Sequence, residues 1–130
     1  MFYDETDILF EEFMDLPFSL LDVVWNPATD LFVTEERIYL MMEIPGVRKD
    51  DLTIMAAPTW VHIRGIKQSP DAFKHGINFY KLEIAYGFFQ KRVILPFRVE
   101  PKNLKISLKE GLLTLEFKRK EKGIEVIKVE

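Results

Sequence analysis

The strongest constraint on the fold is an alternation of apolar residues within residues 37–44. Four of them stand two positions apart: Ile38, Leu40, Met42 and Ile44. In an extended strand, residues two apart project from the same face. Pro45 and Gly46 follow at once and force a turn. The segment therefore predicts a β-strand with one apolar face.

Similar short segments recur along the chain, and turn residues separate them. They cover residues 52–54, 60–64, 79–84, 88–95, 104–108 and 112–117. The last two flank Lys109, Glu110 and Gly111, which predict a tight hairpin with the glycine in a left-handed conformation. Short strands with turn signals roughly every 8–12 residues are typical of a sandwich. We therefore predict an all-β fold, an immunoglobulin-like antiparallel β-sandwich over residues 25–117.

The first 24 residues differ from the rest in charge and in pattern. They contain seven acidic residues and no Lys or Arg, which leaves 14 of the 21 acids beside all 18 bases in residues 25–130. Apolar residues at helical spacing alternate with the acids, and Thr6 and Pro17 are suited to begin and end a helix. A helix of about nine residues is not stable alone in water. We expect a short amphipathic helical arm over residues 1–24 whose aromatic face is buried by another surface.

Residues 118–130 form a second extension. A charged tether precedes Ile124, Val126, Ile127 and Val129. Two of these side chains project together from an extended chain, either Ile127 with Val129 or Ile124 with Val126. Each gains roughly 1.5–3 kcal/mol on entering an apolar groove. The pattern fits a flexible C-terminal tail that docks on another copy of the chain, and equally well a final strand of the chain's own sheet.

Composition narrows the classes of function. A chain of 130 residues makes one domain plus extensions. It has no Cys and no run of 18 apolar residues, so it offers neither thiol chemistry nor a membrane span. An acidic head on a mildly basic body gives nucleic acid and anionic membranes no clear binding surface. We expect a cytoplasmic protein without nucleic-acid or membrane partners.

The residue types that enzymes and metal sites use are not arranged for either purpose. His62 and His75 lie in separate segments and lack a Cys partner. His62 falls in the middle of a predicted strand, where we expect an outward-facing polar residue and not a ligand. Neither a phosphate-binding glycine loop nor a nucleophile elbow occurs in the sequence. We predict no enzymatic activity, no cofactor and no metal.

Six short motifs occur in a fixed order along residues 25–129. They are Trp25-Asn26-Pro27-Ala28-Thr29-Asp30, Glu43-Ile44-Pro45-Gly46-Val47 with Lys49-Asp50-Asp51-Leu52, Ile63-Arg64-Gly65, Glu83 with Tyr86-Gly87, Phe89 and Leu95-Pro96, Gly111-Leu112-Leu113, and the tail pair Ile127 and Val129. In this order they resemble the small heat-shock protein family, whose defining unit is the α-crystallin domain. Each motif alone is weak, and their order makes the assignment strong.

The chain departs from the family pattern at four positions. Lys91 stands where Arg is usual, and Arg92 follows it. Lysine keeps the charge but lacks the bidentate fork of arginine, so an ion pair between subunits there would be looser. Ile106 replaces a usual Ala, Glu110 a usual Asn and Ile66 a common Glu.

The resemblance implies an ATP-independent chaperone, a holdase that binds partly unfolded proteins and suppresses their aggregation. Aromatic and methionine side chains adapt to varied apolar partners, which makes the arm the expected client-binding segment. The side chains concerned are Phe2, Phe10, Phe13, Met14 and Phe18. The same side chains could instead pack at contacts between subunits.

The resemblance also implies that the chain is its own partner in a dynamic homo-oligomer. A strand in the long loop would cross to a neighbouring subunit and form a dimer, and the best candidate is Phe79, Tyr80, Lys81, Leu82, Glu83 and Ile84. A strand within the same chain is the alternative. Charge at the dimer interface is expected from Lys91 and Arg92.

Larger assembly would use the tail, with Ile127 and Val129 as the preferred plug and Ile124 and Val126 as the alternative. The plug would enter a groove of another dimer, lined by Leu52, Ile54, Leu104, Ile106 and Leu108. Gly111 and Leu113 are expected to form the signature turn beside it.

A different class of protein uses a similar sandwich. Co-chaperone adaptors of the CS-domain type bind a folded partner chaperone at one defined surface. Such an adaptor predicts a monomer and has no use for a Gly-x-Leu motif combined with a terminal plug. The oligomeric state therefore separates the two hypotheses.

Overall fold

The computed structural model describes residues 25–120 and residue 129. This part of the chain contains seven strands and three short 3-10 helices. The strands are β1 (Thr29–Val33), β2 (Arg37–Glu43), β3 (Leu52–Ala56), β4 (Trp60–Lys67), β5 (Gly87–Ile94), β6 (Lys105–Lys109) and β7 (Leu112–Lys118). The 3-10 helices are η2 (Lys49–Asp51), η3 (Asp71–Lys74) and η4 (Pro101–Asn103).

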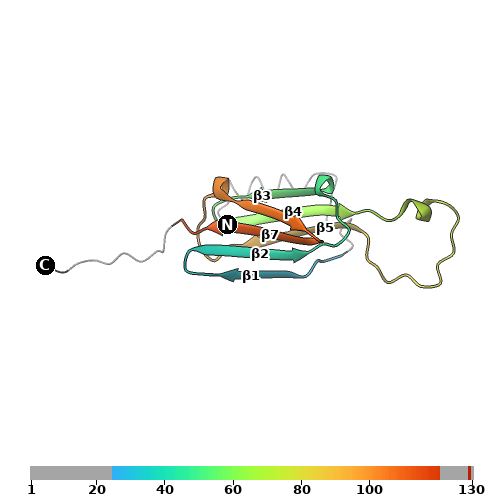
Figure 1. The fold of residues 1–130 in the computed structure, drawn as a ribbon, viewed down its shortest axis with the longest axis horizontal. Helices are drawn as coiled ribbons and strands as arrows, with labels where there is room; N and C mark the ends of the chain where they lie inside the picture. Colours follow the sequence, from blue (N-terminus) through green and yellow to red (C-terminus); the bar gives the residue numbers. More distant parts are fainter. Residues whose placement is uncertain (1–24, 121–128, 130) are drawn as a thin grey trace, which may run out of the picture.

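The strands form two antiparallel sheets that pack on each other. One sheet has the order β1-β2-β7-β6 and the other has the order β3-β4-β5. Figure 1 shows the strands side by side, with the loop between β4 and β5 extending beyond one end of them. The all-β sandwich predicted from the sequence is confirmed. The predicted N-terminal helical arm lies outside the described residues, as does most of the predicted tail.

The apolar face predicted from the alternation in residues 37–44 forms the middle of the core. Its four side chains are fully buried, and β7 contributes Leu113, Leu115 and Phe117 beside them. The burial alternates along both strands, because β2 and β7 pair in register and each turns one face inward. Val61, Ile63 and Phe89 cover this face from the other sheet.

Three of the sequence motifs meet near the start of β5. The Trp25 ring lies edge-on to Phe89 with centroids 5.1 Å apart, and its Nε1 donates to the carbonyl oxygen of Gly87 at 3.1 Å. Gly65 pairs with Phe89 across the sheet, and a Cβ on Gly65 would lie 2.9 Å from the Phe89 ring. Gly65 therefore has to lack a side chain so that the Phe89 ring can lie over it.

The predicted turns form as expected. Gly46 has φ 86° in a turn that is closed by a bond of 3.1 Å from the amide of Val47 to the carbonyl of Ile44. Glu110 and Gly111 form the two-residue loop between β6 and β7, with φ values of 51° and 79°. Two consecutive residues with positive φ are the signature of a type I′ hairpin turn.

Candidate functional site

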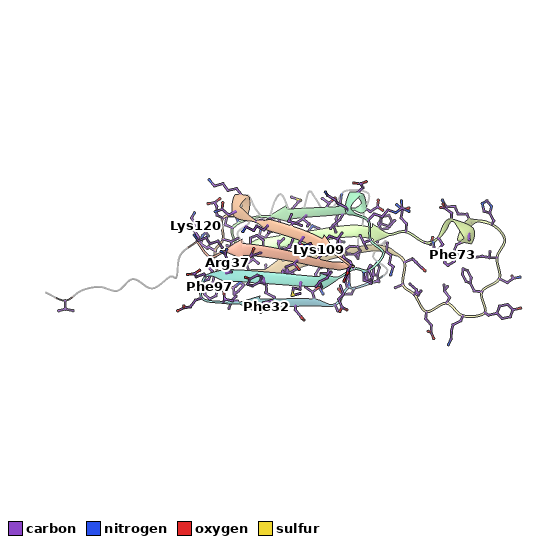
Figure 2. All side chains as sticks on the ribbon, viewed as in Figure 1. Phe32, Arg37, Phe73, Phe97, Lys109 and Lys120 are labelled. Atoms are coloured by element: carbon purple, nitrogen blue, oxygen red, sulfur yellow. The ribbon has the colours of Figure 1, made fainter. Side chains whose placement is uncertain are left out.

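The long loop between β4 and β5, residues 68–86, leaves the sandwich and contains no strand. Figure 2 places Phe73 on this loop, well away from the sheets. The Phe73 ring contacts two other rings edge-on, Phe79 at 4.9 Å and Tyr86 at 5.6 Å between centroids. These contacts join the outgoing and returning sides of the loop.

The predicted crossing strand, residues 79–84, lies in this loop as irregular, exposed chain. Tyr80 is fully exposed, and Leu82 and Ile84 are each 59% exposed. The alternative expectation, a strand in the chain's own sheet, is not found. A cluster of exposed apolar side chains on a projecting loop is typical of a contact surface, and pairing with a second subunit stays a prediction.

Strand β1 offers a second apolar surface, which the sequence analysis missed. It is an edge strand that pairs only with β2, and its Leu31, Phe32 and Val33 are exposed. The Phe32 ring stacks on Tyr39 with centroids 5.1 Å apart, and Phe32 is still 44% exposed (Figure 2). The available signal was three consecutive apolar residues directly after the Trp25–Asp30 motif. An exposed edge combines unpaired backbone groups with apolar side chains, which is what strand addition requires.

The five residues predicted to line a tail groove lie on or beside two edge strands, β3 and β6. Leu52, Ile54, Leu104 and Leu108 are partly buried against the core. Ile106 differs, because it is 54% exposed. The residue that departs from the family pattern is therefore the most accessible of the five, and the groove itself stays a prediction.

Of the predicted tail, the structure describes residues 118–120 and Val129, which is 96% exposed. Ile124, Val126 and Ile127 lie outside the described residues, as do the predicted client-binding side chains Phe2, Phe10, Phe13, Met14 and Phe18. Backbone bonds hold the first residues of this tail to the domain as far as Lys120, whose amide donates to the carbonyl of Arg98 at 3.1 Å.

Lys91 and Arg92 point to opposite sides of β5, as neighbours in a strand do. The Lys91 ammonium donates to the carbonyl of Pro27 at 2.9 Å and to Oγ1 of Thr29 at 3.0 Å. Arg92 points outward, with its guanidinium 5.6 Å from the Trp60 ring centroid. Lys91 thus fastens the first motif to β5, and the predicted interface role of the pair stays a prediction.

The signature residues Gly111 and Leu113 support the domain from within. Leu113 is fully buried in the core. The carbonyl of Gly111 accepts a bond of 2.7 Å from the amide of Ile44. The Gly-x-Leu motif therefore joins the β6–β7 hairpin to the turn that follows β2.

His62 corrects an expectation. Its side chain points to the outer face of β4, as predicted, but it is only 1% exposed. His62 lies on the central strand of its sheet, between Met55 of β3 and Arg92 of β5. Burial lowers the pKa of His62 to about 4, helped by the positive charges of Arg64 and Arg92 and opposed by the side chain of Gln90. His62 is neutral at pH 7.

Residues 30–130 match the family model described as the Hsp20/alpha crystallin family. The chain belongs to this family. Small heat-shock proteins of the family are chaperones that use no ATP, and membership confirms the prediction that the chain is not an enzyme. Among the described residues, no three His, Asp or Glu gather into a group that could hold a metal ion. No helix in this part of the chain is long and apolar enough to cross a bilayer.

Curated relatives support the same family. Small heat shock protein C4 of Rickettsia felis is 29% identical over 77% of this chain and 61% of its own length. Small heat shock protein C2 of the same organism is 28% identical over 90% of this chain and 76% of its own length. The chain therefore spans less than two thirds of the C4 protein that it matches.

Solved structures share the fold. Heat shock protein 16.0 from Schizosaccharomyces pombe superposes with a TM-score of 0.70 at 20% identity, over 82% of this chain and 97% of that one. HSP18.5 from E. histolytica gives 0.65 at 26% identity, over 82% of this chain and 98% of that one. A small heat-shock protein from Xylella fastidiosa, reported with a distinct high order structure, gives 0.67 at 22% identity over 83% of this chain and 99% of that one.

Proposed function

We propose that this protein is an ATP-independent chaperone that binds partly unfolded proteins and suppresses their aggregation as a dynamic homo-oligomer in the cytoplasm. A destabilised client exposes apolar surface that otherwise associates irreversibly. Family membership supports the chaperone class. One observation supports self-assembly. The domain has a buried apolar core of its own, yet apolar side chains remain exposed on residues 79–84 and on β1.

The dimer is proposed to form when residues 79–84 of one subunit add to β1 of another. The two segments are similar in length, since β1 has 5 residues. Each has backbone groups free to pair and apolar side chains free to pack. Strand addition supplies main-chain hydrogen bonds for affinity and alternate side chains for specificity. Residues 79–84 have no strand partner in their own sheet, which leaves them available for such an exchange.

Larger assembly is proposed to use the tail, with Ile127 and Val129 entering the space between β3 and β6 of another dimer. Val129 is exposed and therefore available. Several weak plugs on one assembly hold it together through multivalency while single subunits still exchange.

Client binding is proposed for the arm, through Phe2, Phe10, Phe13, Met14 and Phe18. Their acidic neighbours would keep a loaded complex in solution. The same side chains pack at subunit contacts in the assembled state and serve clients when subunits dissociate.

Light scattering combined with a client-aggregation assay tests this function. The full chain, without ATP, is expected to form particles larger than a dimer and to suppress the turbidity of a thermally unfolding enzyme. A chain without residues 1–20 is expected to suppress it less, while a chain without residues 121–130 tests assembly separately. A monomer that leaves turbidity unchanged would instead indicate the adaptor class.

A further inference from the structure

The inner side of β1 is apolar but only partly covered. Leu31 lies opposite Leu40 of β2, and Val33 lies opposite Ile38. Leu40 and Ile38 are fully buried, so Leu31 and Val33 belong to the inner side of the sheet. They are nonetheless 38% and 43% exposed, and no further strand of the described chain continues the sheet beyond β1. A strand added to this edge covers them if its own apolar side chains point inward.

The outer side of β1 carries an acid. Asp30 lies opposite Met41 of β2, two positions before Phe32 on the same side. Asp30 is exposed, and within the described part of the chain its carboxylate has no ion pair. The outer side of this edge therefore offers a negative charge that no described residue compensates.

A hollow of about 290 Å³ lies beside Asp30. Two acids and three apolar residues line it: Asp30, Glu43, Ala28, Met41 and Leu112. Glu43 is exposed, and it likewise has no ion pair with any residue that the structure describes. A lysine side chain combines an aliphatic stem with a positive head. The hollow therefore matches a lysine in both respects.

Residues 79–84 have the complementary pattern. In an extended strand, Tyr80, Leu82 and Ile84 project to one side, and Lys81 projects to the other. The three apolar side chains are exposed in this structure. When they turn toward the inner side of a β1 strand, Lys81 lies on the outer side, where Asp30 and the hollow are.

Lys81 is available for a new partner. It contacts Glu83 at 3.6 Å, and the two side chains are 78% and 74% exposed. An ion pair between such exposed side chains contributes little to stability. Exchanging this contact for one beside the hollow therefore costs little.

The charges select one register for the added strand. A slip by one residue turns the apolar side outward. A slip by two residues places Glu83 or Phe79 opposite Asp30, which gives a like charge or an aromatic ring there, and like charges directly opposite destabilise a sheet. Lys81 opposite Asp30 keeps the apolar side inward and joins opposite charges. This holds whether the added strand runs parallel or antiparallel to β1.

We propose that Lys81 of one subunit occupies the hollow beside Asp30 of a second copy of the chain, and that this charge pair sets the register in which residues 79–84 add to β1. The inference rests on the proposed dimer and names the contact that decides its register. Residues opposite each other on neighbouring strands have Cβ atoms about 4.5–5.5 Å apart, which is close enough for this pair. A two-fold dimer repeats every contact, so each dimer contains the pair twice.

Charge reversal in the full chain tests the pair. Lys81→Glu alone and Asp30→Lys alone each create two like-charge contacts per dimer, and each is expected to raise the dissociation constant of the dimer about tenfold or more. In an equimolar mixture of the two variants, mixed dimers join opposite charges at both contacts. Sedimentation near the dissociation constant of the unsubstituted dimer should show dimers in the mixture and mostly single subunits in each variant alone. Variants that dimerise normally alone, or a mixture that stays dissociated, would overturn the proposal.

Lys74→Glu and Asp50→Lys are the matched controls. They make the same changes in charge at exposed positions outside β1 and outside residues 79–84. Each control variant should dimerise like the unsubstituted chain. Equal weakening in the controls would assign the effect to net charge and overturn the pairing of Lys81 with Asp30.

Cysteine mapping separates the register from the dimer itself, because the chain has no Cys of its own. Subunits with Asp30→Cys are mixed with tagged subunits that carry Lys81→Cys, Phe79→Cys or Glu83→Cys, and the tag separates mixed disulfides from pairs of like subunits on a non-reducing gel. Each mixed dimer keeps one intact pair of Lys81 and Asp30 at its second contact. Lys81→Cys is expected to give the highest yield of mixed disulfide.

The other outcomes of the mapping are also distinct. A higher yield for Phe79→Cys or Glu83→Cys overturns the register and leaves the strand exchange of the proposed dimer in place. If none of the three forms a mixed disulfide while sedimentation still shows dimers, both the register and the strand exchange are wrong.

Discussion

Gly111 lies directly against Pro45. A Cβ on Gly111 would sit 2.7 Å from Cα of Pro45, closer than real side chains approach. The carbonyl of Gly111 also accepts the amide of Ile44 at 2.7 Å. The motifs that contain Pro45 and Gly111 are far apart in the sequence, and they pack together because residue 111 has no side chain.

Gly111→Ala is expected to lower the free energy of unfolding by about 2–4 kcal/mol, because the alanine suffers both the positive φ of 79° and the contact with Pro45. Chemical denaturation at one protein concentration measures the change. Gly76→Ala is the control, since Gly76 also has positive φ but has no atom within 4 Å of the added Cβ. Its expected cost is about 1 kcal/mol. Similar costs for both variants would remove the contact with Pro45 from the explanation.

Glu110→Asn is expected to stabilise the domain by about 0.5–1 kcal/mol. Glu110 has φ 51°, a left-handed conformation that asparagine adopts more readily than glutamate. The two residues would then form the favoured Asn-Gly type I′ turn. A lower midpoint of denaturation in this variant would contradict the turn assignment.

Leu82→Pro is expected to abolish the dimer. Proline removes the amide that residue 82 would donate to a neighbouring strand. The domain should stay folded, because Leu82 is exposed and lies outside the core. Leu82→Ala keeps the amide and serves as the matched control, for which analytical ultracentrifugation should show a weakened but detectable dimer. Unchanged sedimentation of Leu82→Pro would show that residues 79–84 are not the crossing strand.

Ile127→Ala with Val129→Ala is expected to reduce the assembly to dimers. Each truncation removes apolar surface worth roughly 1–2 kcal/mol per plug contact, and the loss is multiplied over many plugs. Lys128→Ala, which points the other way in an extended tail, is the control. If only Ile124→Ala with Val126→Ala lowers the particle mass, the alternative register is the right one.

His62 predicts a loss of stability in mild acid. Because the folded pKa of about 4 lies below the ordinary 6.5, the unfolded chain binds more protons between these values. Stability from the neutral buried ring is complete above pH 6.5 and is lost as pH falls toward 4, by up to about 2 kcal/mol at pH 5. The difference in unfolding free energy between pH 7 and pH 5 should shrink by that amount in His62→Gln. An equal difference in both proteins would show that His62 does not titrate in this way.

The sequence by itself determined the sandwich and its core. Alternation is a property of an extended chain, so the burial of Ile38, Leu40, Met42 and Ile44 could be predicted without any partner strand. Gly111 in the hairpin turn was predictable for the same reason, because positive φ is a local requirement. The order of the motifs likewise indicated the family.

Only the tertiary structure decided which surfaces remain open and which polar groups are buried. The alternation that places His62 on an outer face does not reveal that β4 is the central strand. Residues 79–84 have the pattern of a strand, and that pattern does not reveal that they pair with no strand of their own domain. The edge position of β1 and the fit of Gly111 to Pro45 also depend on how distant strands pair. Strand order is a non-local property, since loop entropy and packing of the whole domain select it, and local residue patterns do not record it.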